Sequence, residues 1–320
     1  MLRETLNSVL NQSFFDFEII VSNDNPERAL SGETLGIDDR RITFLNQAIN
    51  LGELGNMNFL LSASRGKYFT WIADDDLYRP EFLSSVYEVL NKFSFPECVY
   101  TSFEHLVDSS PVKSKEQQYG EVKLFESAEF VRRYWKNQIR VIGVMGVFDR
   151  EYLIRMGGLE DVSCDGRGMF CEYLLLMRVA ATLKTVVYIE APLILYRLHN
   201  EAWGLKNTDV DMYGRASDTL IKRSLDVLRV PPFNKDFCSN LYGIVKLCSE
   251  NYVAVLFRSK RSNARSSFLF HLVSLWKYTY YRCDSAHLFL LGLVAVTRVE
   301  LPLVANELRY KIGKALHRRG

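Results

Sequence analysis

The 320-residue sequence lacks several patterns that would each define a class of protein. Its six cysteines include no C-x-x-C pair, which excludes zinc-binding and thioredoxin-type motifs. We therefore expect the cysteines to be buried free thiols in a reducing compartment. No apolar run reaches the length of about 20 residues that a spanning helix needs, and the run at 286–296 is too short. Residues 1–12 form an amphipathic helical pattern instead of a signal-peptide core. No nucleic-acid-binding motif is present, so no nucleic-acid partner is expected.

The sequence does contain enough apolar residues for a sizeable core, since 48% are hydrophobic and 24% are charged. Its charge is unevenly distributed. Residues 1–214 hold 22 Lys and Arg against 31 Asp and Glu, a net charge of −9, whereas residues 215–320 hold 18 against 7, a net charge of +11. An acidic part suits a divalent metal ion, and a basic part suits an anionic lipid surface or a phosphate group.

Apolar periodicity predicts strands that alternate with helices in residues 1–208. Strand-like runs lie at 17–21, 41–45, 67–73 and 97–103, and helical spacing occupies 52–65, 80–93 and 171–183. This alternation predicts an α/β domain with a mostly parallel sheet flanked by helices, in which ligands bind beyond the carboxyl ends of the strands. Residues 209–320 have a helical pattern and are predicted to form a basic, α-helical C-terminal region.

Three consecutive carboxylates, Asp74-Asp75-Asp76, are the sharpest chemical feature of the sequence. They follow a predicted strand directly, and their mutual repulsion is unfavourable unless a cation or solvent relieves it. Mg²⁺ and Mn²⁺ take carboxylate oxygens and share their coordination shell with phosphate oxygens. Asp24 also follows a predicted strand, so all four carboxylates are expected in one crevice. The alternative is a solvated acidic turn in which Asp76 caps the helix that begins at Pro80.

The chain resembles family 2 glycosyltransferases of the GT-A fold in four segments, DFEIIVSNDNP, NLGELGNMNFLLSASRGKYFTWIADDDLYRPEFL, GGLEDVSCDGRGMFCEYLLLMRVA and PLILYRLHNEA. These segments occur in the family's order, and the resemblance covers roughly residues 2–202. The resemblance implies an inverting transfer of a sugar from a nucleotide-sugar donor to a hydroxyl of a glycan or lipid-linked glycan, in cell-surface polysaccharide synthesis. It also implies a divalent metal, Mn²⁺ or Mg²⁺, as cofactor.

The same resemblance implies roles for the residues of the donor site. Asp74, Asp75 and Asp76 match the D-x-D element, in which Asp74 and Asp76 would bind the metal while Asp74 and Asp75 would contact the donor. Asp24 matches the aspartate that recognises the nucleotide base, and Asn23 stands where many members have a second aspartate. Asn50 and Gly52 match an N-x-G loop, with Asn56 and Asn58 on the helix behind it; turn formation and helix capping are the alternative for these residues.

The resemblance also implies which residue is the catalytic base and what two residues at the end of the last strand do. Glu172 matches the acidic element that supplies the base in inverting members, with Asp165 as the second candidate. The alternative for Glu172 is a carboxylate favoured by the helix N-terminus. Arg197 and His199 match an R-x-H element, in which Arg197 would contact the donor and His199 would reach the metal or the diphosphate.

Family members begin with a strand and a P-T-Y-N loop, whereas this sequence starts inside the following helix, so a missing first strand is expected. The alternatives are a misplaced start site and a truncated, inactive copy. The second motivates a rival function, a non-catalytic nucleotide- or glycan-binding relic. A metal-dependent phosphohydrolase is a second rival, but the chain lacks its Asp-x-Asp-x-Thr/Val arrangement on a first strand.

The basic region carries aromatic and apolar side chains beside cations, among them Phe268, Leu272 and Trp276. This combination favours helices that lie on an anionic membrane surface. We therefore predict a cytoplasmic protein that binds peripherally to the inner face of the cell membrane. The alternative is an ordinary helical subdomain with a solvated basic face.

Overall fold

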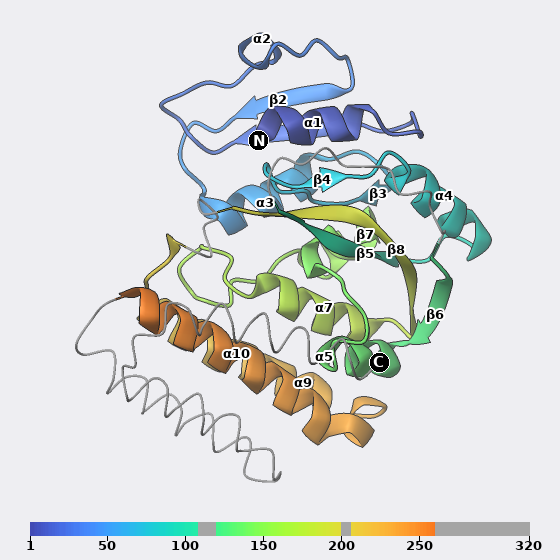
Figure 1. The fold of residues 1–320 in the computed structure, drawn as a ribbon, viewed down its shortest axis with the longest axis vertical. Helices are drawn as coiled ribbons and strands as arrows, with labels where there is room; N and C mark the ends of the chain where they lie inside the picture. Colours follow the sequence, from blue (N-terminus) through green and yellow to red (C-terminus); the bar gives the residue numbers. More distant parts are fainter. Residues whose placement is uncertain (108–119, 200–205, 260–320) are drawn as a thin grey trace.

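The strands of the computed structural model, which describes residues 1–107, 120–199 and 206–259, form two sheets with helices on both sides (Figure 1). In the smaller sheet, β1 (Ile19–Asn23) pairs in parallel with β2 (Ile42–Asn46). The larger sheet has the strand order β3-β7-β5-β8-β4, and β6 also pairs with β8. Its strands are β3 (Tyr68–Phe69), β4 (Leu77–Tyr78), β5 (Cys98–Val107), β6 (Val122–Glu126), β7 (Val147–Asp149) and β8 (Thr185–Leu198).

The α/β class is confirmed, but the large sheet is mixed instead of mostly parallel. Only the β5–β8 pair is parallel there, while β3–β7, β5–β7, β4–β8 and β6–β8 are antiparallel. The predicted strand at 67–73 shortens to β3, and the chain then crosses to the opposite edge of the sheet as β4. A parallel sheet needs a crossover connection of about a dozen residues, usually a helix, between neighbouring strands. The connection between β3 and β4, residues 70–76, is shorter than that.

Helices predicted from apolar spacing are confirmed to within two residues at their ends. The helices are α1 (Leu2–Leu10), α2 (Gly32–Leu35), α3 (Gly52–Ala63), α4 (Phe82–Lys92), α5 (Ser127–Trp135), α6 (Arg150–Arg155), α7 (Cys171–Thr182), α9 (Val210–Leu228) and α10 (Phe237–Ser259), with short 3₁₀ turns η1 (Gly143–Met145) and η2 (Phe233–Asp236). None of these helices combines the length and the apolar character needed to cross a membrane.

Both faces of the large sheet are buried, because successive side chains of a strand point to opposite faces. In β5, Val99 packs into a cluster with Phe82 and Val86 of α4, whereas Tyr100 packs into a second cluster with Leu174 of α7; the side chains of Val99 and Tyr100 are fully buried. The sheet therefore lies between two hydrophobic cores, one on each face.

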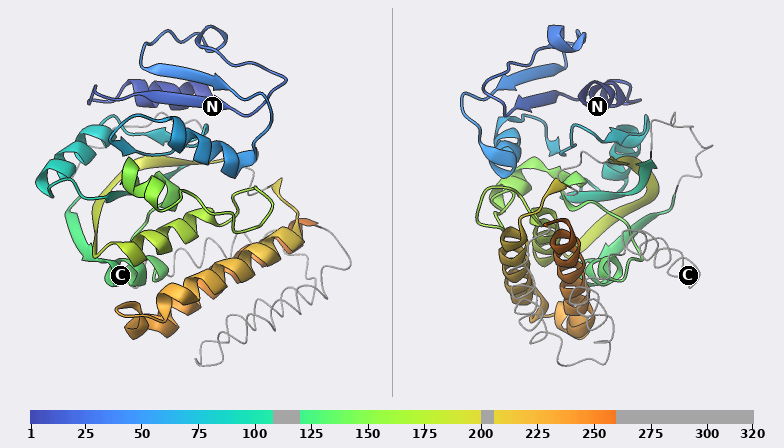
Figure 2. Two further views of the ribbon diagram at one scale, coloured as in Figure 1. Left: turned by 180° about the vertical axis from the view of Figure 1, so that it is seen from behind. Right: turned by 60° about the vertical axis from the view of Figure 1, so that its left-hand side comes forward.

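Helices α9 and α10 lie side by side beneath α7 (Figures 1 and 2). Leu220 of α9 and Ile244 of α10 are fully buried in the same cluster as Leu174. The described part of the C-terminal region thus shares a core with the α/β part, and the boundary after residue 208 stays a prediction. The membrane prediction for Phe268, Leu272 and Trp276 concerns residues outside the described ones.

The cysteines of the described segments are free thiols, as expected, but not all of them are buried. Cys98, Cys171 and Cys248 are buried, whereas Cys164 and Cys238 are exposed. The two exposed residues lie in a loop and in the first turn of α10, where packing on one face leaves the other open.

Gly143 allows the turn η1 to approach the start of α7, and we expect Gly143→Ala to be destabilising. A Cβ atom at Gly143 would collide with the carbonyl oxygen of Glu172. Because both partners are backbone, relief requires a shift of η1 or α7, and the free energy of unfolding should fall by about 1–3 kcal/mol. Denaturant unfolding measures this change.

Gly214→Ala in α9 is the matched control for this substitution. A Cβ atom there would lie 3.5 Å from Tyr252, an ordinary contact. Since alanine favours a helix interior, Gly214→Ala should leave stability unchanged or raise it by up to about 1 kcal/mol. Equal losses in the two variants would contradict the close approach at Gly143.

Candidate active site

The three consecutive aspartates lie on the turn between β3 and β4, and each has a different environment. Asp74 is exposed and Asp75 is half-buried, whereas Asp76 is buried, with 1% of its surface accessible to solvent. The side-chain hydroxyl of Thr5 in α1 donates a hydrogen bond to the carbonyl oxygen of Asp76 at 2.8 Å. This contact fixes the turn against the first helix of the chain.

The end of β8 meets this turn directly. The backbone N–H of Arg197 donates to Oδ1 of Asp76 at 2.7 Å, and its Nε donates to the carbonyl oxygen of Asp75 at 2.7 Å. Nε2 of His199 lies 2.8 Å from Oδ2 of Asp75. Arg197 also forms an ion pair of 2.8 Å with Glu4 of α1. The predicted R-x-H residues and two of the three aspartates therefore form one cluster.

Burial gives this cluster unusual electrostatics. Desolvation, reinforced by the charges of Asp75 and Asp74, raises the pKa of Asp76 to about 7, although the Arg197 hydrogen bond opposes the shift. Oδ2 of Asp76 and Nδ1 of His199 are buried without a hydrogen-bond partner among the described residues. Buried polar atoms are rarely left without a partner, so these two atoms are the natural contacts of a ligand.

The shifted carboxyl group of Asp76 predicts a pH-dependent stability in the absence of a cation. Its folded pKa of about 7 lies above the value of about 3.9 in an unfolded chain. Its favourable contribution is therefore complete below pH 4 and is lost as the pH rises through about 7. Relative to Asp76→Asn, the wild type should lose stability on the order of a few kcal/mol between pH 4 and pH 8. Denaturant unfolding across this range measures the difference, and parallel curves would contradict it.

The donor atoms of the cluster suit a hard divalent cation, because carboxylate oxygens and an imidazole are typical ligands of Mn²⁺ and related ions. Within the described residues, however, no three His, Cys, Asp or Glu side chains converge as a group that could hold a metal ion. His199 contacts Asp75 instead of the predicted partners Asp74 and Asp76. Asp76, whose Oδ2 has no partner among the described residues, directly follows Asp75. A metal at this turn would therefore take its ligands from Asp75, Asp76 and His199, although these side chains do not converge on one point in this structure.

The loop after β1 brings together the residues predicted to recognise the nucleotide. Nδ2 of Asn50 donates to the carbonyl oxygen of Asp24 at 2.9 Å, and the N–H of Leu51 donates to Oδ1 of Asp24 at 2.7 Å. The N–H of Gly52 donates to Oδ1 of Asn50 at 3.0 Å. These bonds close the N-x-G turn. No hydrogen bond or ion pair between described residues joins Asp24 to the aspartate turn.

The asparagines around this loop have structural partners. Asn23 donates to Oδ1 of Asn46 at 2.8 Å and so ties β1 to β2. Asn56 of α3 donates to the carbonyl oxygen of Ser22 at 3.2 Å. Asn58 exchanges two hydrogen bonds of 2.9 Å with the backbone of Leu159. Asn56 and Asn58 thereby fix the position of α3, which carries the N-x-G turn at its start.

Glu172 lies in the first turn of α7 and lines a cavity of about 400 Å³. Burial raises the pKa of Glu172, while a hydrogen bond with Tyr173 opposes the shift. A carboxylate with a raised pKa in a cavity is suited to accept a proton. Tyr196 of β8 also lines the cavity, and burial together with Glu172, Asp76 and Asp75 raises its pKa to about 12. Tyr196 directly precedes Arg197 in β8, so this strand carries residues of both the cavity and the aspartate cluster.

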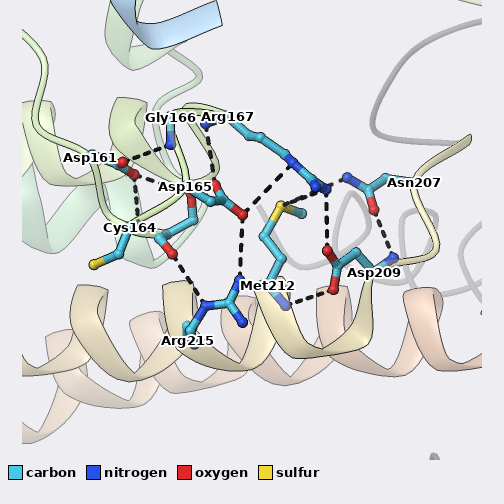
Figure 3. Close-up of polar contacts among 10 residues, drawn as sticks. Asp161, Cys164, Asp165, Gly166, Arg167, Asn207, Asp209, Met212 and Arg215 are labelled. Atoms are coloured by element: carbon cyan, nitrogen blue, oxygen red, sulfur yellow. Dashed lines mark hydrogen bonds and ion pairs between the residues drawn. The ribbon is translucent and has the colours of Figure 1, made fainter. Parts of the chain in front are cut away.

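Asp165, the second candidate base, is engaged in a polar network on the loop before α7 (Figure 3). Its Oδ1 accepts a hydrogen bond of 2.5 Å from Ser163, and its Oδ2 lies 3.5 Å from Arg215 of α9. Arg167 lies 3.8 Å from Asp165 and 3.2 Å from Asp209. These contacts attach the loop to α9 and leave Glu172 as the better placed candidate.

Two neighbours of the site were not predicted from the sequence. Tyr196 directly precedes Arg197 at the end of a strand, where ligands bind in α/β proteins, and this position is the signal that identifies it. Glu4 of α1 contacts Arg197 although the two residues lie near opposite ends of the α/β part of the sequence. No local pattern indicates that contact.

Comparison with known proteins shows which families and folds this chain is similar to. Residues 1–157 match the model of glycosyl transferase family 2, so this part of the chain is similar to that family. An uncharacterized glycosyltransferase of Rickettsia typhi is 28% identical over 127 residues, which cover 38% of this chain and 39% of that protein. The GalNAc(5)-diNAcBac-PP-undecaprenol beta-1,3-glucosyltransferase of Campylobacter jejuni is 37% identical over 95 residues, covering 29% of this chain and 31% of that protein. The chain thus spans between about a third and two fifths of these relatives.

A solved structure extends the comparison beyond the family match. The crystal structure of S. aureus TarS superposes with a TM-score of 0.54 at 10% sequence identity, covering 87% of this chain and 51% of that chain. At this identity the likeness concerns the fold, and it confirms a GT-A-type α/β architecture followed by helices.

Proposed function

We propose that this protein is an inverting glycosyltransferase that moves a sugar from a nucleotide-sugar donor to a hydroxyl of a glycan or lipid-linked glycan, in cell-surface polysaccharide synthesis. The observation that carries the proposal is the cluster of Asp75, Asp76, Arg197 and His199, which β8 joins to the cavity of Glu172 because Tyr196, the residue before Arg197, lines that cavity. The family match of residues 1–157 supports the reaction class. The undecaprenol-linked substrate in the name of the Campylobacter relative supports the acceptor class.

The aspartate cluster is the proposed site of the donor diphosphate. Asp75, Asp76 and His199 would hold Mn²⁺ or Mg²⁺, and a bound cation supplies charge neutralisation for the leaving diphosphate. Arg197 holds the turn of Asp75 and Asp76 in place through its two hydrogen bonds. Asp24 and Asn50 would contact the nucleotide from the loop after β1, and Asp74 would complete the donor contacts from its exposed position.

Glu172 is the proposed base for the acceptor. In this role it takes the proton of the acceptor hydroxyl as the new glycosidic bond forms and the bond between sugar and diphosphate breaks. Its half-buried position supports this role, since burial raises its pKa and so increases its basicity. The acceptor would then enter through the cavity that Glu172 lines.

Donor binding tests this proposal. Thermal unfolding of the full chain with UDP-, GDP- and dTDP-linked sugars, each with Mn²⁺ or with EDTA, should reveal at least one donor that raises the melting temperature in Mn²⁺. A ligand that binds only the folded chain stabilises it by an amount that grows with the logarithm of the ratio of its concentration to its dissociation constant. If no nucleotide sugar stabilises the folded chain in either condition, the proposed donor site is wrong.

We also propose that the protein is cytoplasmic and binds to the inner membrane surface through its basic C-terminal region. The support is the net charge of +11 in residues 215–320. Each Lys or Arg near an anionic surface contributes about 1 kcal/mol, and salt weakens the attraction. The full chain should sediment with vesicles of anionic lipid at low salt, and high salt should release part of it. Equal sedimentation with neutral vesicles, or none with anionic ones, would contradict membrane binding.

A further inference from the structure

A polar pocket of about 640 Å³ lies where the loop before α7 meets the start of α9. Its volume is within the range of about 300–1,000 Å³ that is usual for small-molecule sites. The pocket shares no lining residue with the cavity of Glu172 or with the aspartate cluster. Its charged lining consists of three cations, Arg167, Lys206 and Arg215, and two carboxylates, Asp209 and Asp211, a net charge of +1.

The carboxylates beside the two arginines already hold the backbone in place. Oδ1 of Asp165 accepts hydrogen bonds from the N–H of Arg167 at 3.3 Å and from the side chain of Ser163 at 2.5 Å. Oδ1 of Asp209 accepts from the N–H of Met212 at 3.0 Å and so caps α9. Each of these carboxylates therefore meets an arginine side chain through its second oxygen, Oδ2, alone.

The ion pairs of the two arginines are long (Figure 3). Nε of Arg167 lies 3.8 Å from Asp165, and its Nη1 lies 3.2 Å from Asp209. Nη2 of Arg215 lies 3.5 Å from Asp165. A charge-assisted hydrogen bond usually measures about 2.7–2.9 Å, so none of these pairs has that geometry.

Both guanidinium groups also keep donors that no described residue uses. Nη2 of Arg167 and Nη1 of Arg215 make no hydrogen bond or ion pair with the described part of the chain. The two side chains remain accessible, with 48% and 51% of their surface exposed. A ligand that enters the pocket can therefore reach both groups.

A phosphate group fits this arrangement best. A guanidinium presents paired N–H donors that match two phosphate oxygens, and a phosphate has enough oxygens to engage two such groups at once. Lys206 adds a third positive charge to the lining. The first turn of α9 adds the partial positive charge of a helix N-terminus.

We propose that this pocket binds a phosphate or diphosphate group of a soluble ligand, held between Arg167 of the loop and Arg215 of α9. The polar lining offers no apolar wall for a lipid tail. The site goes beyond the proposed function, because it uses neither the metal nor any residue of the donor site. The same loop supports the N-x-G turn, since the N–H of Leu54 donates to the carbonyl oxygen of Gly166 at 3.2 Å. A bound phosphate would therefore tie the loop behind that turn to α9.

Calorimetric titration of the full chain with pyrophosphate tests the pocket. The buffer contains EDTA at constant ionic strength, so no metal ion can bring the anion to the aspartate cluster. Arg167→Gln and Arg215→Gln each remove one guanidinium group. Arg223→Gln is the matched control, because Arg223 is a similarly exposed arginine of α9 that pairs with Glu160 outside the pocket.

Pyrophosphate should bind the wild type and Arg223→Gln equally. Arg167→Gln and Arg215→Gln should each weaken binding by about ten- to hundredfold, the effect of one lost charged hydrogen-bond partner. Circular dichroism identifies any variant that fails to fold, and the other variant then decides. The proposal is wrong if pyrophosphate does not bind the wild type, or if a folded pocket variant binds it as the wild type does.

Asp211→Asn gives a test in the opposite direction, because it removes a negative charge from the lining. It should tighten pyrophosphate binding by about two- to fivefold, the effect of one partly exposed charge. A loss of structure cannot produce this gain. Weaker binding by a folded Asp211→Asn variant would contradict an anion in the pocket.

Two further diphosphates distinguish a soluble ligand from a lipid phosphate. Methyl diphosphate and geranyl diphosphate carry the same charge and differ in their apolar tails. Their affinities should be equal, because the pocket has no apolar surface on which the longer tail could be buried. A preference of about tenfold or more for geranyl diphosphate would overturn the assignment to a soluble ligand.

Donor stabilisation in Mn²⁺, measured on the same protein, separates this proposal from the proposed function. Nucleotide-sugar binding without pyrophosphate binding in EDTA overturns the phosphate pocket alone. Pyrophosphate binding that depends on Arg167 and Arg215, without any nucleotide-sugar binding, supports the phosphate pocket and overturns the proposed donor site.

Discussion

Glu172→Gln should lower the rate of sugar transfer by about 10²–10⁴-fold, the usual effect of losing a general base. The substitution keeps the size of the side chain and its hydrogen-bonding groups, but an amide cannot take the proton of the acceptor. Donor affinity should be unchanged, because the groups proposed to hold the diphosphate belong to the separate cluster around Asp75 and His199. Steady-state transfer assays and calorimetric titration of the donor measure the two quantities.

Asp165→Asn is the matched control, since it makes the same carboxylate-to-amide change on the loop before α7. Asp165 is occupied by Ser163, Arg167 and Arg215, so its loss should loosen the loop and affect transfer much less than the loss of Glu172. Normal turnover in Glu172→Gln together with a large loss in Asp165→Asn would mean that the base has been assigned to the wrong carboxylate.

Asp75→Asn should lower transfer by about 10²–10³-fold, because metal-assisted charge stabilisation of the leaving group is worth several kcal/mol. The substitution removes the negative charge that faces His199 at 2.8 Å. His199→Gln should give a loss of similar size, and the double variant should be little worse than either single one, because the two residues act as a unit. Transfer rates over a range of Mn²⁺ concentrations measure these effects.

Asp74→Asn distinguishes the observed geometry from the family pattern. Sequence resemblance assigns the metal to Asp74 and Asp76, whereas His199 contacts Asp75 and the side chain of Asp74 is exposed. Asp74→Asn should therefore cost less activity than Asp75→Asn. If Asp74→Asn loses the response to Mn²⁺ and Asp75→Asn retains it, the assignment by resemblance is right and the one made from the geometry is wrong.

Local patterns predicted the helices of this chain well and its sheet poorly. Helices α3 and α7 were predicted to within two residues because their apolar residues recur at helical spacing and the chain changes composition at their ends. The strand expected at 67–73 reduces to Tyr68–Phe69, because pairing with β7 stops where the chain leaves the sheet. Strand direction depends on the partner, which no local pattern encodes.

The site was predicted where it lies on a few short motifs and missed where distant segments meet. Asp75, Asp76, Arg197 and His199 belong to two recognisable motifs, and the structure brings these motifs together. The cavity was not predicted, because its lining combines residues as distant as Phe103 and Lys246. The close approach of Trp135 in α5 to Gly243 of α10 likewise depends on how the two helices pack, which helical periodicity alone does not determine.

Nucleotide release is the measurement that tests the central claim most directly. The full chain would be incubated with each nucleotide sugar in turn, with Mn²⁺ and a membrane extract as the source of acceptor, and the freed nucleoside diphosphate would be quantified. We expect at least one donor to be consumed by the wild type and left intact by Glu172→Gln, although both proteins bind it. Donor binding without any release by the wild type would contradict a catalytic role and would favour a nucleotide- or glycan-binding relic.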